Sequence, residues 1–146
     1  MKLTWCHNRL AIGSEDGCGV EALEEAGVTH LVNCRRAPVR FAGTSSYAAW
    51  LAVLWNPAED DGRPKPAEWF ARSIEFALGA LAGPQYRVCV CCCHGNNRAP
   101  STALAILMAQ GLAFDEAFGL VRLARPDAEA RYAQDALAAV KVLGYA

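Results

Sequence analysis

A short apolar run in the second half of the chain constrains the fold more than any other stretch. Residues Arg87–Cys92 read Arg-Val-Cys-Val-Cys-Cys, so apolar side chains would point to both faces of an extended segment. Strands of this kind are typical of parallel sheets, which helices cover on both sides. The run therefore predicts a buried strand in an α/β fold.

Other segments predict further strands and loops. Residues 2–6 and 9–12 are short apolar runs around His7-Asn8, which predicts a hairpin. Residues 29–34 and 50–55 are further β-rich or apolar runs. Residues 35–47 lack a usable period, and residues 56–66 hold three acids and three prolines. We expect both of these segments to be loops.

Apolar residues at a spacing of three to four predict the helices. They occupy residues 20–26, 70–81, 104–108, 114–121 and 137–143. Gly27 and Gly83 follow the first two, as is usual after a helix end, and Asp127 is the predicted N-cap of the last. Strands that alternate with helices predict a central, mainly parallel twisted sheet flanked by helices. We expect residues 1–146 to form a single domain.

Composition excludes several classes of protein. Hydrophobic residues make up 53% and charged residues 20% of the chain, which is typical of a globular protein and not of a disordered one. A formal net charge of −1 argues against general nucleic-acid binding. The longest apolar run, residues 47–55, is too short to span a bilayer, and the N-terminus lacks the apolar core of a signal peptide. We expect a cytoplasmic protein without membrane contact.

Seven cysteines are present, and four of them lie within residues 89–93. Adjacent cysteines cannot form the spread disulfide framework of a secreted scaffold. Four consecutive residues, 91–94, also cannot close a tetrahedral zinc site. We therefore expect neither a metal nor another cofactor, and a reactive thiol becomes the leading interpretation.

The segment Cys92-Cys93-His94-Gly95-Asn96-Asn97-Arg98 lies between the buried strand and the next helix. Ligands of open parallel sheets bind beyond the carboxyl ends of the strands. A loop of this length can wrap its backbone N–H groups around one tetrahedral oxyanion, with the positive end of the helix beside it. The Arg98 guanidinium could bind two of the anion's oxygens, and the same positive field favours Cys92 as the nucleophilic thiolate.

This segment resembles the Cys-x5-Arg signature of the protein tyrosine phosphatase superfamily, in particular its small dual-specificity phosphatases. Flanking segments are similar to the family's first two strand motifs, the helix after the loop, and a downstream helix with its Arg-Pro end. They are Leu10–Ser14, Gly27–Asn33, Arg98–Ala103, Asp115–Ala117 and Arg122–Pro126. The resemblance runs in order from about residue 9 to about residue 137.

The resemblance implies a metal-independent phosphatase that acts on phosphate monoesters. Cys92 would form a phosphocysteine intermediate, and Arg98 with loop residues 93–97 would bind the phosphate. The family's general acid lies in the loop about thirty residues before the cysteine. That position favours Asp60, with Asp61 as the alternative. The implied partner is a phosphorylated protein carrying phosphotyrosine, phosphoserine or phosphothreonine, or another phosphomonoester.

Two positions depart from the family pattern. Cys91 stands where the family usually has histidine, and Ala99 where a serine or threonine hydroxyl assists departure of the thiolate. We expect that Ser101 does not replace this hydroxyl and that turnover is weaker than in a standard member. A weakly active, phosphate-binding pseudo-phosphatase is therefore one alternative.

The loop also resembles that of the cysteine-dependent RNA 5′-triphosphatases through His94 and Asn97. That resemblance keeps an RNA 5′ end, or a small phosphorylated ligand, as an alternative substrate. Cys93 and Cys34 are further candidates for a different role, as thiols that could form a disulfide with an oxidised Cys92.

Overall fold

The computed structural model describes residues 3–38 and 50–145. Five strands form one sheet in the order β1-β2-β5-β3-β4. Their bounds are Leu3–His7 (β1), Leu10–Gly13 (β2), His30–Asn33 (β3), Ala52–Trp55 (β4) and Val88–Cys91 (β5). The β1–β2 hairpin is antiparallel, whereas the β2–β5, β5–β3 and β3–β4 pairs are parallel. The predicted mainly parallel sheet is confirmed.

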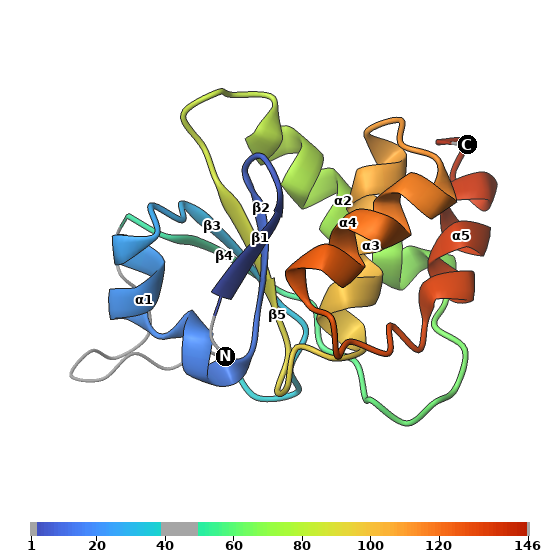
Figure 1. Ribbon diagram of the computed structural model, residues 1–146, viewed down its shortest axis with the longest axis horizontal. Coiled ribbons are helices and arrows are strands. Elements are labelled where there is room, and N and C mark those ends of the chain that lie inside the picture. The colour runs from blue at the N-terminus through green and yellow to red at the C-terminus, as the bar shows by residue number, and fades with distance from the viewer. Residues whose placement is uncertain (1–2, 39–49, 146) are drawn as a thin grey trace.

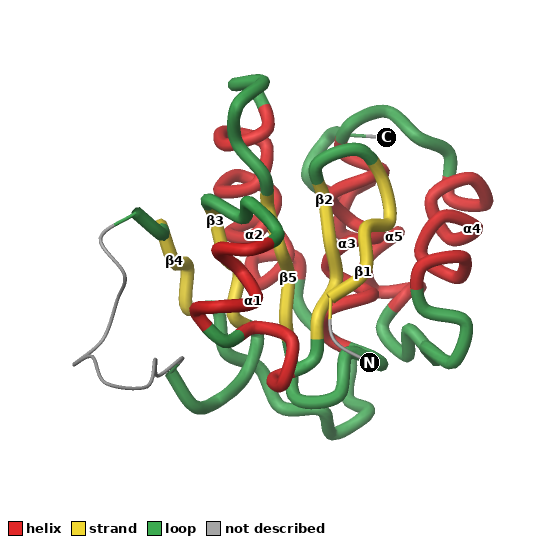
Figure 2. The backbone as a smooth tube through the Cα atoms, turned by 60° about the vertical axis from the view of Figure 1, so that its left-hand side comes forward, coloured by secondary structure: helices red, strands yellow, loops and turns green. Residues whose placement is uncertain are grey.

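Helices cover both faces of this sheet. They are α1 (Val20–Glu25), α2 (Ala67–Leu81), α3 (Arg98–Ala109), α4 (Phe114–Ala124) and α5 (Ala133–Val142), and a short 3₁₀ turn, η1, spans Glu15–Cys18. Figure 1 shows α2, α3, α4 and α5 on one side of the strands. The turned view in Figure 2 places α1 on the other side. The described residues contain no helix that is both long and apolar enough to cross a membrane.

β5 occupies the centre of the sheet, as the apolar run predicts. All of its residues are buried, and they alternate between two cores. Val88 and Val90 pack in the larger core beneath α2 and α3, and Cys92 belongs to that core as well. Cys89 and Cys91 pack in the smaller core with Leu23 of α1. The strand is therefore apolar on both faces because both faces are covered.

α3 is more deeply buried than its sequence pattern predicts. Every residue from Arg98 to Met108 is buried, although the pattern indicated one apolar face. The helix packs against β2 and β5 and also against α2, α4 and α5. Small residues such as Ala99, Ala103 and Ala105 allow these close approaches.

The prediction of Asp127 as the N-cap of the last helix is wrong. α5 begins at Ala133, and Tyr132 occupies its N-cap position. The preceding residues form an irregular turn, in which Ala130 has a positive φ of 49°. They are held by the loop that precedes α3, because the Ala130 N–H donates to the Asn96 carbonyl at 2.9 Å. These tertiary contacts replace the first helical turn that Asp127 would have capped.

The described residues 34–38 after β3 and the loops that follow β4 and β5 lie at one end of the sheet, at the bottom of Figure 1. Parallel strands produce this arrangement because their carboxyl ends meet at the same edge. The predicted loop over residues 56–66 is confirmed and contains no helix or strand. Most of the predicted loop over residues 35–47 lies outside the described residues.

Candidate active site

Residues 92–97 form a loop between β5 and α3, and outside groups hold three of its carbonyl oxygens. The donors are the backbone of η1, the side chain of Arg125 and the turn before α5. The bonds run from Glu15 N to Cys93 O at 3.1 Å, from Arg125 Nη2 to His94 O at 2.9 Å, and from Ala130 N to Asn96 O at 2.9 Å. Three separate elements therefore donate hydrogen bonds to backbone carbonyl oxygens of the loop.

The backbone N–H groups of the same loop differ from its carbonyl oxygens. Within residues 3–38 and 50–145, no hydrogen bond is donated by the N–H groups of residues 93–98. Successive backbone N–H groups with their carbonyls engaged elsewhere form an anion-binding nest. The loop is therefore suited to bind a phosphate through its main chain.

Gly95 gives the loop its turn. Its φ is +70°, in the left-handed region that residues with a Cβ rarely adopt. A Cβ at this position would lie 2.5 Å from Arg125 Nη2 and 3.3 Å from the Gly13 carbonyl oxygen. The buried Arg125 side chain thus fills the space beneath Gly95, and the loop shape depends on both residues.

Cys92 begins the loop with its side chain at the N-terminus of α3. It is buried, and its Sγ accepts a hydrogen bond from the Ala99 N–H at 3.4 Å. A backbone donor and the positive end of a helix both favour negative charge at this position. Ser101 lies one residue beyond Pro100, and its Oγ accepts a hydrogen bond from Tyr132 N at 3.1 Å. Its hydroxyl thus takes part in packing α5.

Arg98 connects the loop to the segments that follow β3 and β4. Its Nη1 donates to the Ala58 carbonyl at 2.8 Å and to the Cys34 carbonyl at 3.3 Å. The side chain is buried, and its Nε has no hydrogen-bond partner among the described residues. A buried guanidinium fixed at one nitrogen and unpaired at another is suited to bind an anionic ligand.

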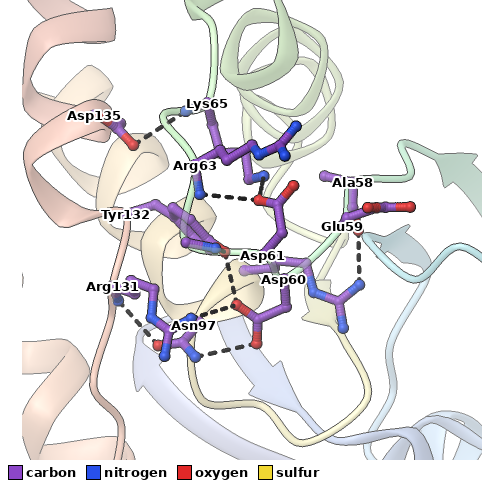
Figure 3. A network of polar contacts seen from close by, with 12 residues as sticks. Ala58, Glu59, Asp60, Asp61, Arg63, Lys65, Asn97, Arg131, Tyr132 and Asp135 are labelled. Atoms are coloured by element: carbon purple, nitrogen blue, oxygen red, sulfur yellow. Dashed lines mark hydrogen bonds and ion pairs between the residues drawn. The ribbon is translucent and has the colours of Figure 1, made fainter.

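Asp60 faces the loop, as Figure 3 shows. Its Oδ2 accepts a hydrogen bond from Asn97 Nδ2 at 3.1 Å, and its Oδ1 accepts one from the Tyr132 hydroxyl at 2.7 Å. Arg131 Nη1 lies 3.9 Å from Oδ1. Burial alone would raise the pKa of Asp60, but the two hydrogen bonds and the positive charges of Arg98 and Arg131 outweigh it and lower that pKa.

The two acids adjacent to Asp60, Glu59 and Asp61, have different contacts. Asp61 Oδ1 accepts hydrogen bonds from Lys65 Nζ at 2.8 Å and from Arg63 N at 3.0 Å, and these contacts lower its pKa. Glu59 forms an exposed ion pair with Arg36 at 2.8 Å. Of the three acids, Asp60 is the one that hydrogen-bonds a residue of the 92–98 loop. The two aspartates predicted as alternatives for the general acid thus differ in their hydrogen-bond partners.

The other buried cysteines lie in the two cores. Cys91 Sγ donates to Asn33 Oδ1 at 3.8 Å, and its pKa is raised by hydrogen bonding to Cys18 and by burial. Cys18 Sγ and Cys89 Sγ lie 4.0 Å apart. Among the residues that the structure describes, no group of histidine, cysteine or acidic residues could hold a metal ion.

The two candidate redox partners of Cys92 differ in exposure. Cys34 is fully buried beside Thr102, and burial raises its pKa well above the usual range for a thiol. Cys93 is partly exposed. Their roles as redox partners stay predictions.

Sequence reasoning missed Tyr132 and Arg125. Tyr132 is 72 positions from Asp60, so no local pattern connects the two. Arg125 was visible as part of the Arg-Pro end of α4, which could have indicated a contact with the loop. Its contact with the His94 carbonyl gives that motif a physical role in the site.

A scan against models of protein families finds no match, and a search of curated protein sequences also finds none. Solved structures do match. A variant of human DUSP28 is 26% identical with a TM-score of 0.82, and the match covers 99% of this chain and 97% of that chain. A mouse putative dual specificity phosphatase, solved with zinc tungstate, is 23% identical with a TM-score of 0.83 over 98% of this chain and 91% of that one.

A third structure, the human tyrosine phosphatase-like serine/threonine/tyrosine-interacting protein, is 18% identical with a TM-score of 0.77 and covers 99% of both chains. Two of these three likenesses are below 25% identity and show the fold alone. The match to DUSP28 spans nearly the whole length of both chains, and it agrees with the Cys-x5-Arg loop between a central strand and a buried helix. The chain has the fold of the dual-specificity phosphatases of the protein tyrosine phosphatase superfamily and is similar to them over nearly its whole length.

Proposed function

We propose that this protein hydrolyses phosphate monoesters through a phosphocysteine intermediate on Cys92, in one catalytic domain spanning residues 1–146. The observation that carries the proposal is the hydrogen bonding of the 92–98 loop. Other elements donate hydrogen bonds to its carbonyl oxygens, whereas, among the described residues, the N–H groups of residues 93–98 and Arg98 Nε have no acceptor and can bind a phosphate. Protein phosphotyrosine, phosphoserine and phosphothreonine are the substrates that we propose. The activity belongs in the cytoplasm, where a thiolate stays reduced.

In the first step, Cys92 Sγ attacks phosphorus opposite the ester oxygen. An S–P bond forms, the P–O bond breaks, and Asp60 gives its proton to the departing oxygen. Negative charge on the three equatorial oxygens is stabilised by the loop N–H groups and by Arg98. Arg98 is already fixed to the Ala58 carbonyl, so little reorganisation accompanies the step.

In the second step, water attacks the phosphocysteine. The Asp60 carboxylate takes a proton from this water, an O–P bond forms, and the S–P bond breaks to return the Cys92 thiolate. Inorganic phosphate leaves, and Asp60 is protonated again. The Ala99 N–H, which donates to Sγ at 3.4 Å, stabilises the thiolate as it departs.

The substrate class is tested by comparing kcat/KM for four compounds under reducing conditions. They are p-nitrophenyl phosphate, a phosphotyrosine peptide, a phosphothreonine peptide and triphosphate-ended RNA. The proposal expects p-nitrophenyl phosphate and at least one phosphopeptide to be hydrolysed. A strong preference for the RNA would support the triphosphatase alternative. Phosphate binding without turnover of any compound would identify a pseudo-phosphatase.

The assignment of the acid predicts different effects at two adjacent positions. Asp60→Asn is expected to lower kcat/KM for phenyl phosphate by about 10²–10⁴-fold, because its leaving oxygen needs the proton. Asp61→Asn is the matched control and should leave the rate nearly unchanged, since Asp61 bonds Lys65 and Arg63. Loss of activity in Asp61→Asn alone would reassign the acid.

Ala99→Ser should improve turnover, because it supplies the hydroxyl that the sequence lacks beside Cys92. One added hydrogen bond to the departing thiolate is worth about 1 kcal/mol, or roughly fivefold in the rate of phosphocysteine hydrolysis. Pre-steady-state measurement of the phosphoenzyme separates this step from its formation. Ala109→Ser, at the other end of α3, is the control. An unchanged hydrolysis rate in Ala99→Ser would mean that thiolate departure does not limit turnover.

A further inference from the structure

Tyr132 combines a buried ring with a hydroxyl at the active site. The residue is 1% exposed, and it occupies the N-cap position of α5. Its hydroxyl donates to Asp60 Oδ1 at 2.7 Å and accepts the Gly62 N–H at 3.0 Å. Both hydrogen bonds end in the loop that carries the proposed acid, so the rigid ring fixes this loop from the core side (Figure 3).

Asn97 holds the other oxygen of the same carboxylate. Its Nδ2 donates to Asp60 Oδ2 at 3.1 Å, and its Oδ1 accepts the Arg131 N–H at 3.0 Å. Asn97 therefore connects the phosphate loop (residues 92–98), the acid loop (residues 56–66) and the turn before α5. A further bond, from Lys65 N to Asp135 Oδ2 at 3.1 Å, attaches the end of the acid loop to α5 itself.

We propose that Tyr132 is a positioning residue that, together with Asn97, holds Asp60 over the phosphate loop and sets the pH range in which Asp60 donates its proton. The inference rests on the proposed role of Asp60 as the acid. One donor on each carboxylate oxygen fixes the orientation of the group, and two such donors stabilise its ionised form.

The groups that face Asp60 all favour the carboxylate. Besides the two donors, Arg98 at the start of α3 and Arg131 before α5 contribute positive charge, and Arg131 also pairs with Glu129 at 3.8 Å. Burial, and next the contact with Asp60, raise the pKa of Tyr132, so the phenol keeps its proton. During catalysis the proton therefore moves from Asp60 to the leaving oxygen, while Tyr132 only donates a hydrogen bond to the new carboxylate.

Tyr132→Phe tests this role because it removes the hydroxyl and keeps the buried ring. A carboxylate that loses a donor has a higher pKa, so Asp60 stays protonated to higher pH. The alkaline limb of the kcat/KM profile for phenyl phosphate is expected to move up by about one pH unit. Tyr86→Phe is the matched control, since Tyr86 is exposed and lies at the opposite end of β5. Its profile should coincide with that of the wild type.

A double variant decides whether Tyr132 acts through Asp60. Asp60→Asn should remove the alkaline limb, and adding Tyr132→Phe to it should change kcat/KM no further. Thermal unfolding of each variant shows whether the fold is retained. An unshifted alkaline limb in a folded Tyr132→Phe variant, with Asp60→Asn still impaired, would overturn the inference and leave the proposed function intact. Full activity in Asp60→Asn would instead overturn the assignment of the acid.

Discussion

Cys92→Ser is expected to lower the turnover of p-nitrophenyl phosphate by about 10⁴-fold or more. A serine hydroxyl is scarcely ionised at neutral pH, so the N-terminus of α3 and the Ala99 N–H have no anion to stabilise. The substitution changes little in volume at a side chain that is 2% exposed, so the fold should be retained. Steady-state kinetics under reducing conditions give the rate, and thermal unfolding monitors the fold.

Three further measurements make this result specific to Cys92. The variant should still bind inorganic phosphate, because the loop N–H groups and Arg98 are unchanged. Cys6→Ser, at a free cysteine of β1 outside the loop, should retain turnover of the same order as the wild type. Wild-type turnover in Cys92→Ser would contradict the mechanism. Mass spectrometry of the wild type, quenched during turnover, should show one phosphoryl group on Cys92.

The central strand and the loop after it could be predicted from the sequence because their determinants are local. The apolar run of β5 requires two covered faces, and the structure provides them. Cys92 and Arg98 are six positions apart, so the strand, the loop and the start of α3 bring them into one site. Resemblance to a known family then indicated the loop in which to seek the acid.

The surroundings of Asp60 could not be predicted in the same way. Whether Asp60 or Asp61 faces the phosphate loop depends on Tyr132 and Asn97, which are brought there by packing of α3 and α5. The start of α5 was misplaced for a related reason. Tertiary hydrogen bonds to the loop held residues 130–131 outside the helix, and these bonds overrode the local capping preference of Asp127.

Gly95→Ala should lower activity strongly and destabilise the protein, through backbone strain and through a close contact with Arg125. A left-handed φ costs a residue with a Cβ about 1–2 kcal/mol. The new Cβ would also lie 2.5 Å from Arg125 Nη2 and 2.9 Å from its Cζ. Overpacking of this kind costs about 1–3 kcal/mol. Together these effects should lower the free energy of unfolding by about 2–5 kcal/mol, measured by denaturant titration.

The loss of activity should exceed what unfolding explains. Arg125 holds the His94 carbonyl, so displacing it changes the loop that binds phosphate. Under conditions where the variant is folded, we expect kcat/KM to fall by about 100-fold or more, since small misplacements in a site are costly. Gly79→Ala is the matched control, because Gly79 lies in α2 and a Cβ there would meet no neighbouring element within 4 Å. That substitution should stabilise the helix slightly. A folded, fully active Gly95→Ala would mean that phosphate binding does not depend on this turn.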